Sequence, residues 1–374
     1  ITSMAPCTGT PTVGAASATS RNCASEPFTL SVASATKAGG ITYQWQRADA
    51  GTGIWQPISG ATTASYTVTN QTVASDYRFV ITCSYSTNTV TSNVVTVTQN
   101  AASYIFEGFE NTPTGSSTNN TYPSCWSYVD TVTSSGYGYV STSAANNGSN
   151  GFYTYRTSTT GASYDGDVLL ISPETNNLGN GTKQLRFSAK VSSASYISTH
   201  KFEVYTTNGT TNTATKTLLQ GSIPLTNNWQ EFIIPIPSTT DDYFAFSFER
   251  NGGISYVYLD DIYYEDLSPC AAPGDIQSSA ITQTAATISW DFSLSTAVTG
   301  YEYEVRTSGA AGSGATGLVV TNTTSATTNT VNLSNLMPGT YYTVYVRSIC
   351  GSTSGSWSTF PHTFNTLCGV VNYL

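Results

Sequence analysis

Charged residues are scarce in this chain. Of its 374 residues, 13 are Lys or Arg and 22 are Asp or Glu, which gives a formal net charge of −9. Nucleic acids and anionic membrane surfaces are bound through clusters of basic residues, so this balance argues against both as partners. The excess of acidic residues suits a soluble extracellular surface and the binding of cations.

Long apolar runs and the usual catalytic motifs are also lacking. No stretch is long and apolar enough to span a membrane, so membrane insertion is not expected. The cysteines form no Cys-x-x-Cys pair and the chain has two histidines, which disfavours zinc and redox sites. Gly-x-Ser-x-Gly, His-Glu-x-x-His and phosphate-binding glycine loops are absent, and His200 and His362 are expected at the surface. We therefore expect no catalytic site here; any catalytic domain would belong to another part of a longer polypeptide.

Strand-forming residues dominate what is present. Apolar residues make up 39% of the chain, mostly β-branched and aromatic types, alongside abundant Ser, Thr, Asn, Gly and Tyr. These types favour strands, and no long segment repeats its apolar residues every 3.6 positions. Seven widely spaced cysteines favour disulfides formed in an oxidising compartment. The length suits two or three domains, so we expect a multi-domain all-β protein.

Residues 1–99 contain short alternating runs typical of strands. The first clear run is Phe28–Val32; a second, at 41–46, contains Trp45, and a third covers 76–83. The Tyr-x-Trp-Gln and Asp-Tyr patterns resemble the immunoglobulin-like repeats of large bacterial surface proteins. The resemblance implies a β-sandwich with Trp45 in its core.

The cysteines of this first domain differ from those of antibody domains. The positions of the usual bridge between sheets correspond to Val32 and Phe79, which would form an apolar contact. Cys83 lies near the end of its strand, and Cys23 is its first-choice partner, with Cys7 as the second choice. A bridge that closes roughly 60 residues contributes about 4 kcal/mol in the chain-entropy model.

The central segment, residues 104–266, begins and ends with alternating runs that carry paired carboxylates, at 104–110 and 256–264. If these first and last strands lie side by side, their carboxylates converge and repel one another unless a hard cation lies among them. We therefore predict a structural calcium site at the four acidic residues Glu107, Glu110, Asp260 and Asp261. The alternative is that they are solvated carboxylates at strand ends.

About eight strand-like runs, at the spacing of a jelly roll, lie within residues 104–266. Four motifs occur in order: Glu-Gly-Phe-Glu at 107–110, Pro-Ser-Cys-Trp at 123–126, Leu-Ile-Ser-Pro at 170–173 and Tyr-Leu-Asp-Asp-Ile at 258–262. They resemble the cleaved-adhesin, MAM-like jelly rolls of the choice-of-anchor J type. Such modules occur on adhesins and protease-linked haemagglutinin regions exported by the bacterial type IX secretion system. The resemblance implies export by that machinery and an extracellular or outer-surface location.

Residues 270–366 carry an early tryptophan, Trp290, and a Leu-x-Pro-Gly-Thr-x-Tyr run at 336–342. These features resemble the fibronectin type III family. Cys270 precedes the first strand and Cys350 follows the sixth, at the same end of such a sandwich, so they are predicted to form a disulfide. We thus expect three tandem β-sandwiches: Ig-like, jelly roll and fibronectin type III.

The two ends of the sequence suggest a longer protein. The chain begins abruptly at Ile1, so we expect either a processed leader or an internal fragment. Residues 367–374 echo residues 101–105, the approach to the central segment. They are interpreted as the start of a further, truncated module, in which Cys368 would pair beyond Leu374.

Five tyrosines of the central domain fall in segments rich in loop-forming residues: Tyr137, Tyr139, Tyr153, Tyr155 and Tyr164. Jelly rolls often bind sugars by stacking exposed aromatic rings on pyranose faces, so these are candidate glycan-binding residues. The simpler interpretation is that tyrosine is a strand former with one polar end.

Thr131 is a candidate for modification. It lies in an Asp-Thr-Val triplet that resembles the O-glycosylation site used by some bacteria of the same kind. A three-residue pattern also arises readily by chance in a chain so rich in threonine.

Together these patterns predict a non-catalytic adhesion or spacer segment of a large secreted or cell-surface bacterial protein. Its expected partners are surface glycans or proteins, and the secretion machinery during export. One alternative is a set of carbohydrate-binding modules that accompany a secreted hydrolase. The other is a secretion-system cargo without a specific binding role.

Overall fold

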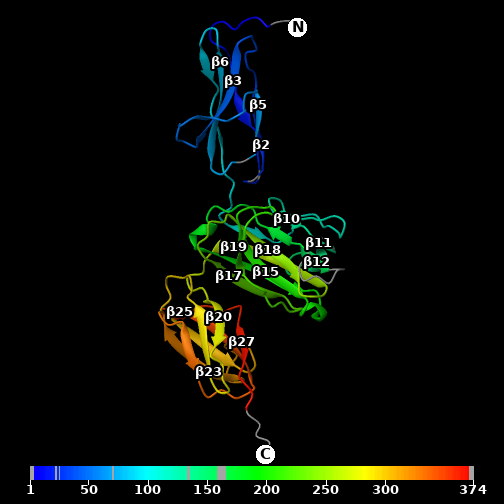
Figure 1. The fold of residues 1–374 in the computed structure, drawn as a ribbon, viewed down its shortest axis with the longest axis vertical. Helices are drawn as coiled ribbons and strands as arrows, with labels where there is room; N and C mark the ends of the chain where they lie inside the picture. The colour runs from blue at the N-terminus through cyan, green and yellow to red at the C-terminus, as the bar shows by residue number, and fades with distance from the viewer. Residues whose placement is uncertain are drawn as a thin grey trace, which may run out of the picture. The chain divides into compact units, whose positions relative to one another are not determined.

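The computed structural model describes residues 4–21, 23–24, 26–69, 71–132, 135–157 and 166–369. The predicted all-β fold is confirmed: the described chain consists of strands paired in antiparallel sheets, with three short 3-10 helices. It divides into two compact units, Ile1–Ala102 and Ser103–Leu374 (Figure 1). Among the described residues, no helix is long and apolar enough to cross a membrane.

The first unit is a sandwich of two sheets around Trp45. One sheet has the order β1 (Ala16–Ala18), β2 (Phe28–Val32), β5 (Ser65–Val68). The other has the order β4 (Gln56–Pro57), β3 (Ile41–Asp49), β6 (Ser75–Cys83), β7 (Thr89–Thr91), and β8 (Val95–Val97) also pairs with β6. Trp45 is fully buried, lies 4.9 Å from the Phe79 ring between centroids, and donates its indole N–H to the Thr63 carbonyl at 3.1 Å.

The expected Cys23–Cys83 disulfide is wrong, because Cys83 bonds to Cys7. The N-terminal segment runs beside residue 39, where the Cys7 N–H donates to the Gly39 carbonyl at 2.9 Å. β3 begins two residues later, and its first residue is paired with Cys83. Two residues before Cys23, the guanidinium of Arg21 bonds to Thr98, next to the strand that pairs with the opposite end of β6. Cys7 is therefore at the correct end of the sheet.

Residues 105–266 form a second sandwich. Its first sheet has the order β10 (Ser127–Asp130), β13 (Val168–Ile171), β18 (Tyr243–Arg250), β15 (His200–Thr207), β16 (Lys216–Gln220). Its second sheet has the order β11 (Ser135–Ser141), β12 (Gly151–Thr157), β19 (Ser255–Asp266), β14 (Lys183–Val191), β17 (Gln230–Ile236), with β9 (Ile105–Glu107) on β19. The 3-10 helices η1 (Thr142–Ala144), η2 (Leu178–Asn180) and η3 (Ala194–Tyr196) lie in its loops.

The core of this sandwich lies between the two sheets. Phe187 of β14 contacts Phe246 of β18 with ring centroids 5.0 Å apart, and both rings are fully buried. β9 pairs with β19, so the first and last strands lie side by side, which was the condition for their carboxylates to converge. This pairing brings Glu107 opposite Ile262.

Residues 274–365 form a third sandwich. One sheet has the order β20 (Gly274–Ser279), β21 (Ala286–Asp291), β24 (Thr330–Leu333). The other has the order β23 (Leu318–Ser325), β22 (Gly300–Arg306), β25 (Tyr341–Cys350), β26 (Thr353–Ser354), with β27 (His362–Asn365) on β25. Trp290 is buried in the core, and the predicted Cys270–Cys350 disulfide is present. Cys368 is exposed with a free thiol. Of residues 367–374, the predicted start of a further module, 370–374 lie outside the described residues.

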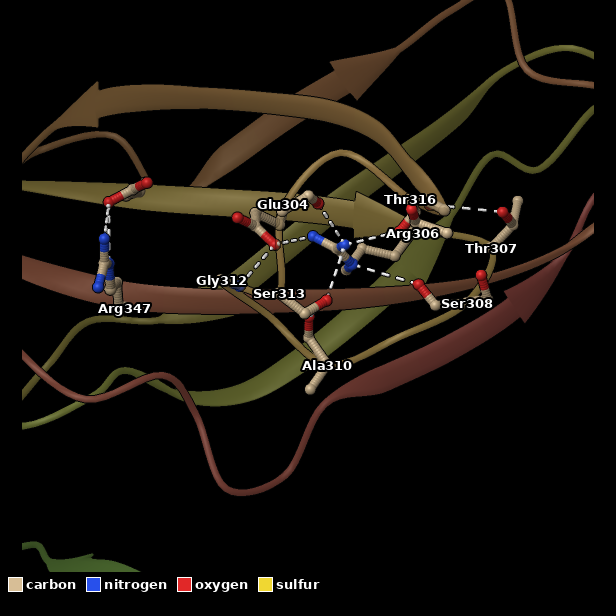
Figure 2. Close-up of polar contacts among 12 residues, drawn as sticks. Glu304, Arg306, Thr307, Ser308, Ala310, Gly312, Ser313, Thr316 and Arg347 are labelled. Atoms are coloured by element: carbon tan, nitrogen blue, oxygen red, sulfur yellow. Dashed lines mark hydrogen bonds and ion pairs between the residues drawn. The ribbon is translucent and has the colours of Figure 1, made fainter.

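A buried ion pair holds the loop between β22 and β23. Figure 2 shows Arg306, whose side chain is fully buried, bonded to Glu304 at 2.6 Å. The guanidinium also donates to the carbonyls of Gly314 at 2.7 Å and Thr316 at 2.9 Å. Glu304 in turn accepts the N–H of Gly312 at 3.1 Å. These bonds offset the cost of removing both charges from water, and they fix the loop on the sheet.

Candidate functional site

Six tyrosines lie on the outer face of the β11-β12-β19 part of the second sandwich. We call this set, which consists of Tyr137, Tyr139, Tyr153, Tyr155, Tyr256 and Tyr258, the tyrosine face. Each strand contributes two of them, two positions apart, and the residues between or beside them, such as Val140, Phe152 and Val257, are buried in the core. Strand alternation thus explains why all six side chains share one face.

The strand register orders these rings in two rows. Tyr139, Tyr153 and Tyr258 are paired across the three strands in one row, and Tyr137, Tyr155 and Tyr256 in the other. Ring centroids within the rows are 4.8–5.4 Å apart. Tyr196 of η3 extends the second row, with its ring 4.7 Å from that of Tyr256. The rings therefore form a continuous aromatic surface, and each side chain of the tyrosine face is half-buried rather than covered.

Four phenol groups of this face have pKa values raised above the ordinary value for tyrosine. Burial among its neighbours raises the pKa of Tyr153, and the surrounding phenols Tyr137 and Tyr139 raise it further. Burial likewise raises the pKa of Tyr137, Tyr256 and Tyr258. These four residues thus offer neutral hydroxyl groups that both donate and accept hydrogen bonds, next to apolar ring surface.

The structure brings together four of the five tyrosines that the sequence singled out. Tyr137, Tyr139, Tyr153 and Tyr155 lie in the tyrosine face, on strands rather than in the loops that were expected, while Tyr164 lies outside the described residues. Tyr256 and Tyr258 were missed as site residues. The signal that marks them is their spacing of two within the closing strand, which was used only to predict that strand.

Three of the four predicted calcium ligands, Glu110, Asp260 and Asp261, bond to one loop, residues 146–150, which we call the capping loop. Asp260 is fully buried; its carboxylate accepts N–H bonds from Asn146 at 2.7 Å, Asn147 at 3.3 Å and Asp261 at 2.7 Å. Glu110 accepts the N–H groups of Ser149 at 2.8 Å and Asn150 at 3.0 Å. Glu107 is bonded to the Phe109 N–H at 2.6 Å instead.

These contacts bear on whether the four residues fit calcium. In the part of the chain that the structure describes, no three acidic, histidine or cysteine side chains are grouped so as to hold a metal ion. The expected convergence of all four carboxylates is therefore not seen, because backbone and side-chain amides bind them separately. The side-chain types do suit a hard cation. Asp261 is bonded to the side-chain amides of Asn146 and Asn147. Each amide also has a carbonyl oxygen, which is a ligand that calcium accepts. The calcium site stays a prediction.

The pKa of Asp260 is raised to about 7, mainly by burial and in smaller part by the neighbouring charge of Asp261. The three N–H groups that the carboxylate accepts act in the opposite direction. Removing this carboxyl group from water is thus the dominant effect, which is the usual result for a buried acid without a cationic partner beside it.

Two other sequence expectations concern single residues. His200 was expected at the surface but is buried. Its ring nitrogens lie 3.1 Å from the Tyr196 and Ile223 carbonyls, and the ring accepts the Leu225 N–H. The hydroxyl of Thr131 accepts the N–H of Asp167 at 2.8 Å and the residue is half-buried. O-glycosylation of Thr131 stays a prediction.

Comparison with known proteins bears on the class of this chain. A model of the fibronectin type III domain matches residues 271–363, and a model described as a domain of unknown function (DUF8696) matches residues 12–101. No curated protein matches the chain. The chain is thus a multi-domain β-sandwich protein that includes a fibronectin type III domain.

Three solved structures illustrate what the chain is similar to. The K1 cleaved-adhesin domain of Lys-gingipain from Porphyromonas gingivalis W83 is 20% identical, with a TM-score of 0.35, and the match covers 45% of this chain and all of that one. A carbohydrate-binding module of the β-sandwich superfamily is 15% identical, with a TM-score of 0.29, over 70% of this chain and all of that one. A fibronectin type III domain of human contactin 1 is 17% identical, with a TM-score of 0.24, over 28% of this chain and 83% of that one.

Proposed function

We propose that this chain is a non-catalytic extracellular adhesion segment and that its tyrosine face binds glycans on other surfaces. The observation that carries this proposal is the contiguous set of six partly exposed rings on one side of a sheet. A pyranose ring presents C–H groups on its faces and hydroxyl groups around its edge. A tyrosine side chain matches both: its ring face packs on the C–H groups, and its hydroxyl bonds to the sugar hydroxyls.

A purely structural role explains the tyrosine face less well. Tyrosine favours strands, which accounts for any one of these positions. It does not account for the same residue at six neighbouring positions on a single solvent-facing side, where Ser, Thr and Asn are elsewhere abundant. Contiguous aromatic surface on a soluble protein commonly marks an interaction site.

Location and export form the second part of the proposal. The Cys7–Cys83 and Cys270–Cys350 disulfides suit an oxidising compartment, which supports an extracellular or outer-surface location. Export by a type IX secretion system is supported by the ordered jelly-roll motifs of residues 104–266. The test is to compare culture medium and cell-surface fractions of the source bacterium with and without a working type IX system. Equal amounts outside the cell in both strains would contradict this route.

The tyrosine face is tested with a glycan array probed with the intact chain. Binding to a defined set of glycans is expected, and Tyr137→Ala or Tyr258→Ala should weaken it at least tenfold. Tyr341→Ala is the matched control, because Tyr341 is also a strand tyrosine but is exposed on the third sandwich. Retained melting temperature shows that each variant is folded.

Two results would separate this proposal from its alternatives. If no glycan binds, or if both tyrosine-face variants bind like the unchanged chain, glycan adhesion through this face is rejected. A spacer or a secreted cargo would then remain. If glycans of a single polysaccharide bind and a hydrolase domain flanks the chain in the parent protein, the segment is a carbohydrate-binding accessory of that enzyme.

A further inference from the structure

A pocket opens on the same sheet as the tyrosine face, beyond the strand β19. It has a volume of about 310 Å³ and lies over β14, β17 and β19. Its walls include Asn146, Asn147, Ser188, Trp229, Asp261 and Tyr263. Small-molecule sites commonly measure roughly 300–1,000 Å³, so this pocket has the size for one small ligand.

The local sequence explains why the sheet is hollow here. Ser188 is the smallest of the outward side chains of β14 and lies between Arg186 and Lys190. The pairing of β14 with β19 shifts its register at this point, a β-bulge that buries Asp260 and leaves Asp261 at the pocket. The backbone of Asp261 has a φ of 52°, which is the left-handed region. Bulges of this kind re-aim side chains and are common beside binding sites.

One wall of the pocket is a set of bonded polar groups. Asp261 accepts one N–H bond from the side chain of Asn146 at 2.8 Å and one from that of Asn147 at 2.6 Å. The Asn146 amide is also 3.2 Å from the hydroxyl of Ser188, which is buried. A primary amide has two N–H donors and a carbonyl acceptor, so this wall can still bind hydroxyl groups in either sense. Its side chains are held in place before a ligand arrives.

The opposite walls are aromatic and carry little net charge. Trp229 directly precedes β17, and Tyr263 stacks under the guanidinium of Arg186 at 3.8 Å. Arg186, which also lines the pocket, is bonded twice to Glu265, at 3.0 Å each, and once to the pocket residue Glu231 at 3.3 Å, so its charge is balanced by carboxylates. With Asp261 in the wall, an anionic ligand is disfavoured.

The pocket and the tyrosine face are connected. The ammonium group of Lys190 lies 5.1 Å from the Trp229 ring and 5.4 Å from the ring of Tyr258. Tyr258 belongs to the tyrosine face and Trp229 to the pocket. Lys190 therefore joins an aromatic ring of the tyrosine face to one of the pocket, and a ligand on the face can extend along these groups into the pocket.

We infer that the pocket binds one neutral pyranose residue, the end or a branch of a glycan that lies along the tyrosine face. The sugar hydroxyls bond to Asn146, Asn147 and Asp261, and an apolar ring face packs on Trp229. This inference rests on the proposed function and adds to it the ligand class and the residues that select it. It also predicts that a negative charge on the sugar weakens binding, so uronic and sialic acids should bind worse than neutral sugars.

The test uses the intact chain and methyl glycosides of glucose, galactose, mannose and glucuronic acid, with binding measured by NMR titration. At least one neutral glycoside is expected to bind with millimolar affinity, and the glucuronide to bind more weakly. Trp229→Ala and Asn147→Ala should each weaken that binding at least tenfold. Trp55→Ala is the matched control, because Trp55 also carries a stacked cation, Arg78 at 4.3 Å, but lies in the first unit.

The outcomes separate this inference from the proposed function. If array glycans bind through the tyrosine face but no neutral methyl glycoside binds, or Trp229→Ala binds normally, the pocket inference fails and the proposed function stands. If monosaccharides bind in the pocket while Tyr137→Ala leaves all glycan binding unchanged, the pocket stands and the tyrosine face is rejected. If no sugar of any size binds, both are overturned.

Discussion

The carboxylate of Asp260 accepts the backbone N–H of Asn146 at 2.7 Å, although 114 residues separate the two in sequence. The capping loop that begins at Asn146 also donates two N–H groups to Glu110, near the start of the sandwich. One short loop thus binds acidic side chains from both ends of residues 104–266. The pairing of β9 with β19 places those ends together, and the loop then covers them.

Gly148 gives a direct test of the capping loop. Its φ is 71°, and a Cβ built there would overlap the Glu110 carboxylate. Gly252 has a similar φ of 83°, yet a Cβ there meets no atom within 4 Å. Alanine in this backbone region costs roughly 1–2 kcal/mol, so Gly252→Ala measures that strain alone. Gly148→Ala should lower the free energy of unfolding by about 1–3 kcal/mol more, since it also displaces Glu110. Equal losses in urea unfolding would show that Glu110 moves aside freely.

The sequence predicted most of this architecture because local patterns determine it. The alternation in Phe28–Val32 appears as β2, and Trp45 lies in a core. Cys270 and Cys350 were paired correctly because Cys270 lies shortly before β20 and Cys350 ends β25, two strands of one small sandwich. The partner of Cys83 was wrong because it depends on which end of the sheet a remote N-terminal segment reaches. No pattern near Cys7 or Cys23 specifies that contact.

The candidate site was less predictable for two physical reasons. Tyr256 and Tyr258 alternate with Val257 and Leu259, so both sides of the strand are large and partly apolar, and periodicity alone does not say which side faces solvent. The β-bulge at the two aspartates cannot be inferred from alternation either. The bulge buries Asp260 and leaves Asp261 half-buried. It thus separates two carboxylates that would converge in a regular strand pair.

Calcium binding is tested by melting the chain in calcium and in chelator. A ligand that binds only the folded state adds about 2.7 kcal/mol at a concentration one hundred times its dissociation constant. We expect a higher melting temperature in calcium, and Glu110→Gln should remove most of the increase. Asp49→Asn is the control, because Asp49 is an exposed carboxylate of the first unit. Identical melting curves in both buffers would reject the calcium site.

The buried ion pair of the third sandwich predicts that substitution of Arg306 lowers the free energy of unfolding more than substitution of Arg347. Arg306→Met should cost about 3–5 kcal/mol, because it leaves the Glu304 carboxylate buried without its partner. Arg347→Met keeps a chain over Trp357 and breaks the pair with Glu302, which is more exposed, so about 1 kcal/mol or less is expected. Figure 2 shows Arg306 and Arg347 on the same sheet, which makes them a matched pair. If the two variants lose similar unfolding free energy in chemical denaturation, the Glu304–Arg306 pair is not buried as described.

Glu249 predicts how stability depends on pH. Burial raises the pKa of its carboxyl group to about 7, although Arg156, at 2.8 Å, acts to lower it. Between the ordinary value near 4.5 and 7, the folded chain therefore holds more of this proton than the unfolded chain, and the contribution of Glu249 to stability falls as the pH rises. Glu249→Gln removes this titration, while the similarly raised Asp260 titrates in both proteins and cancels. From pH 4.5 to 7.5 the unfolding free energy of the unchanged chain should thus fall relative to that of Glu249→Gln, by at most about 3 kcal/mol. Parallel curves, measured by urea unfolding at constant ionic strength, would show that Arg156 keeps the carboxylate ionised throughout.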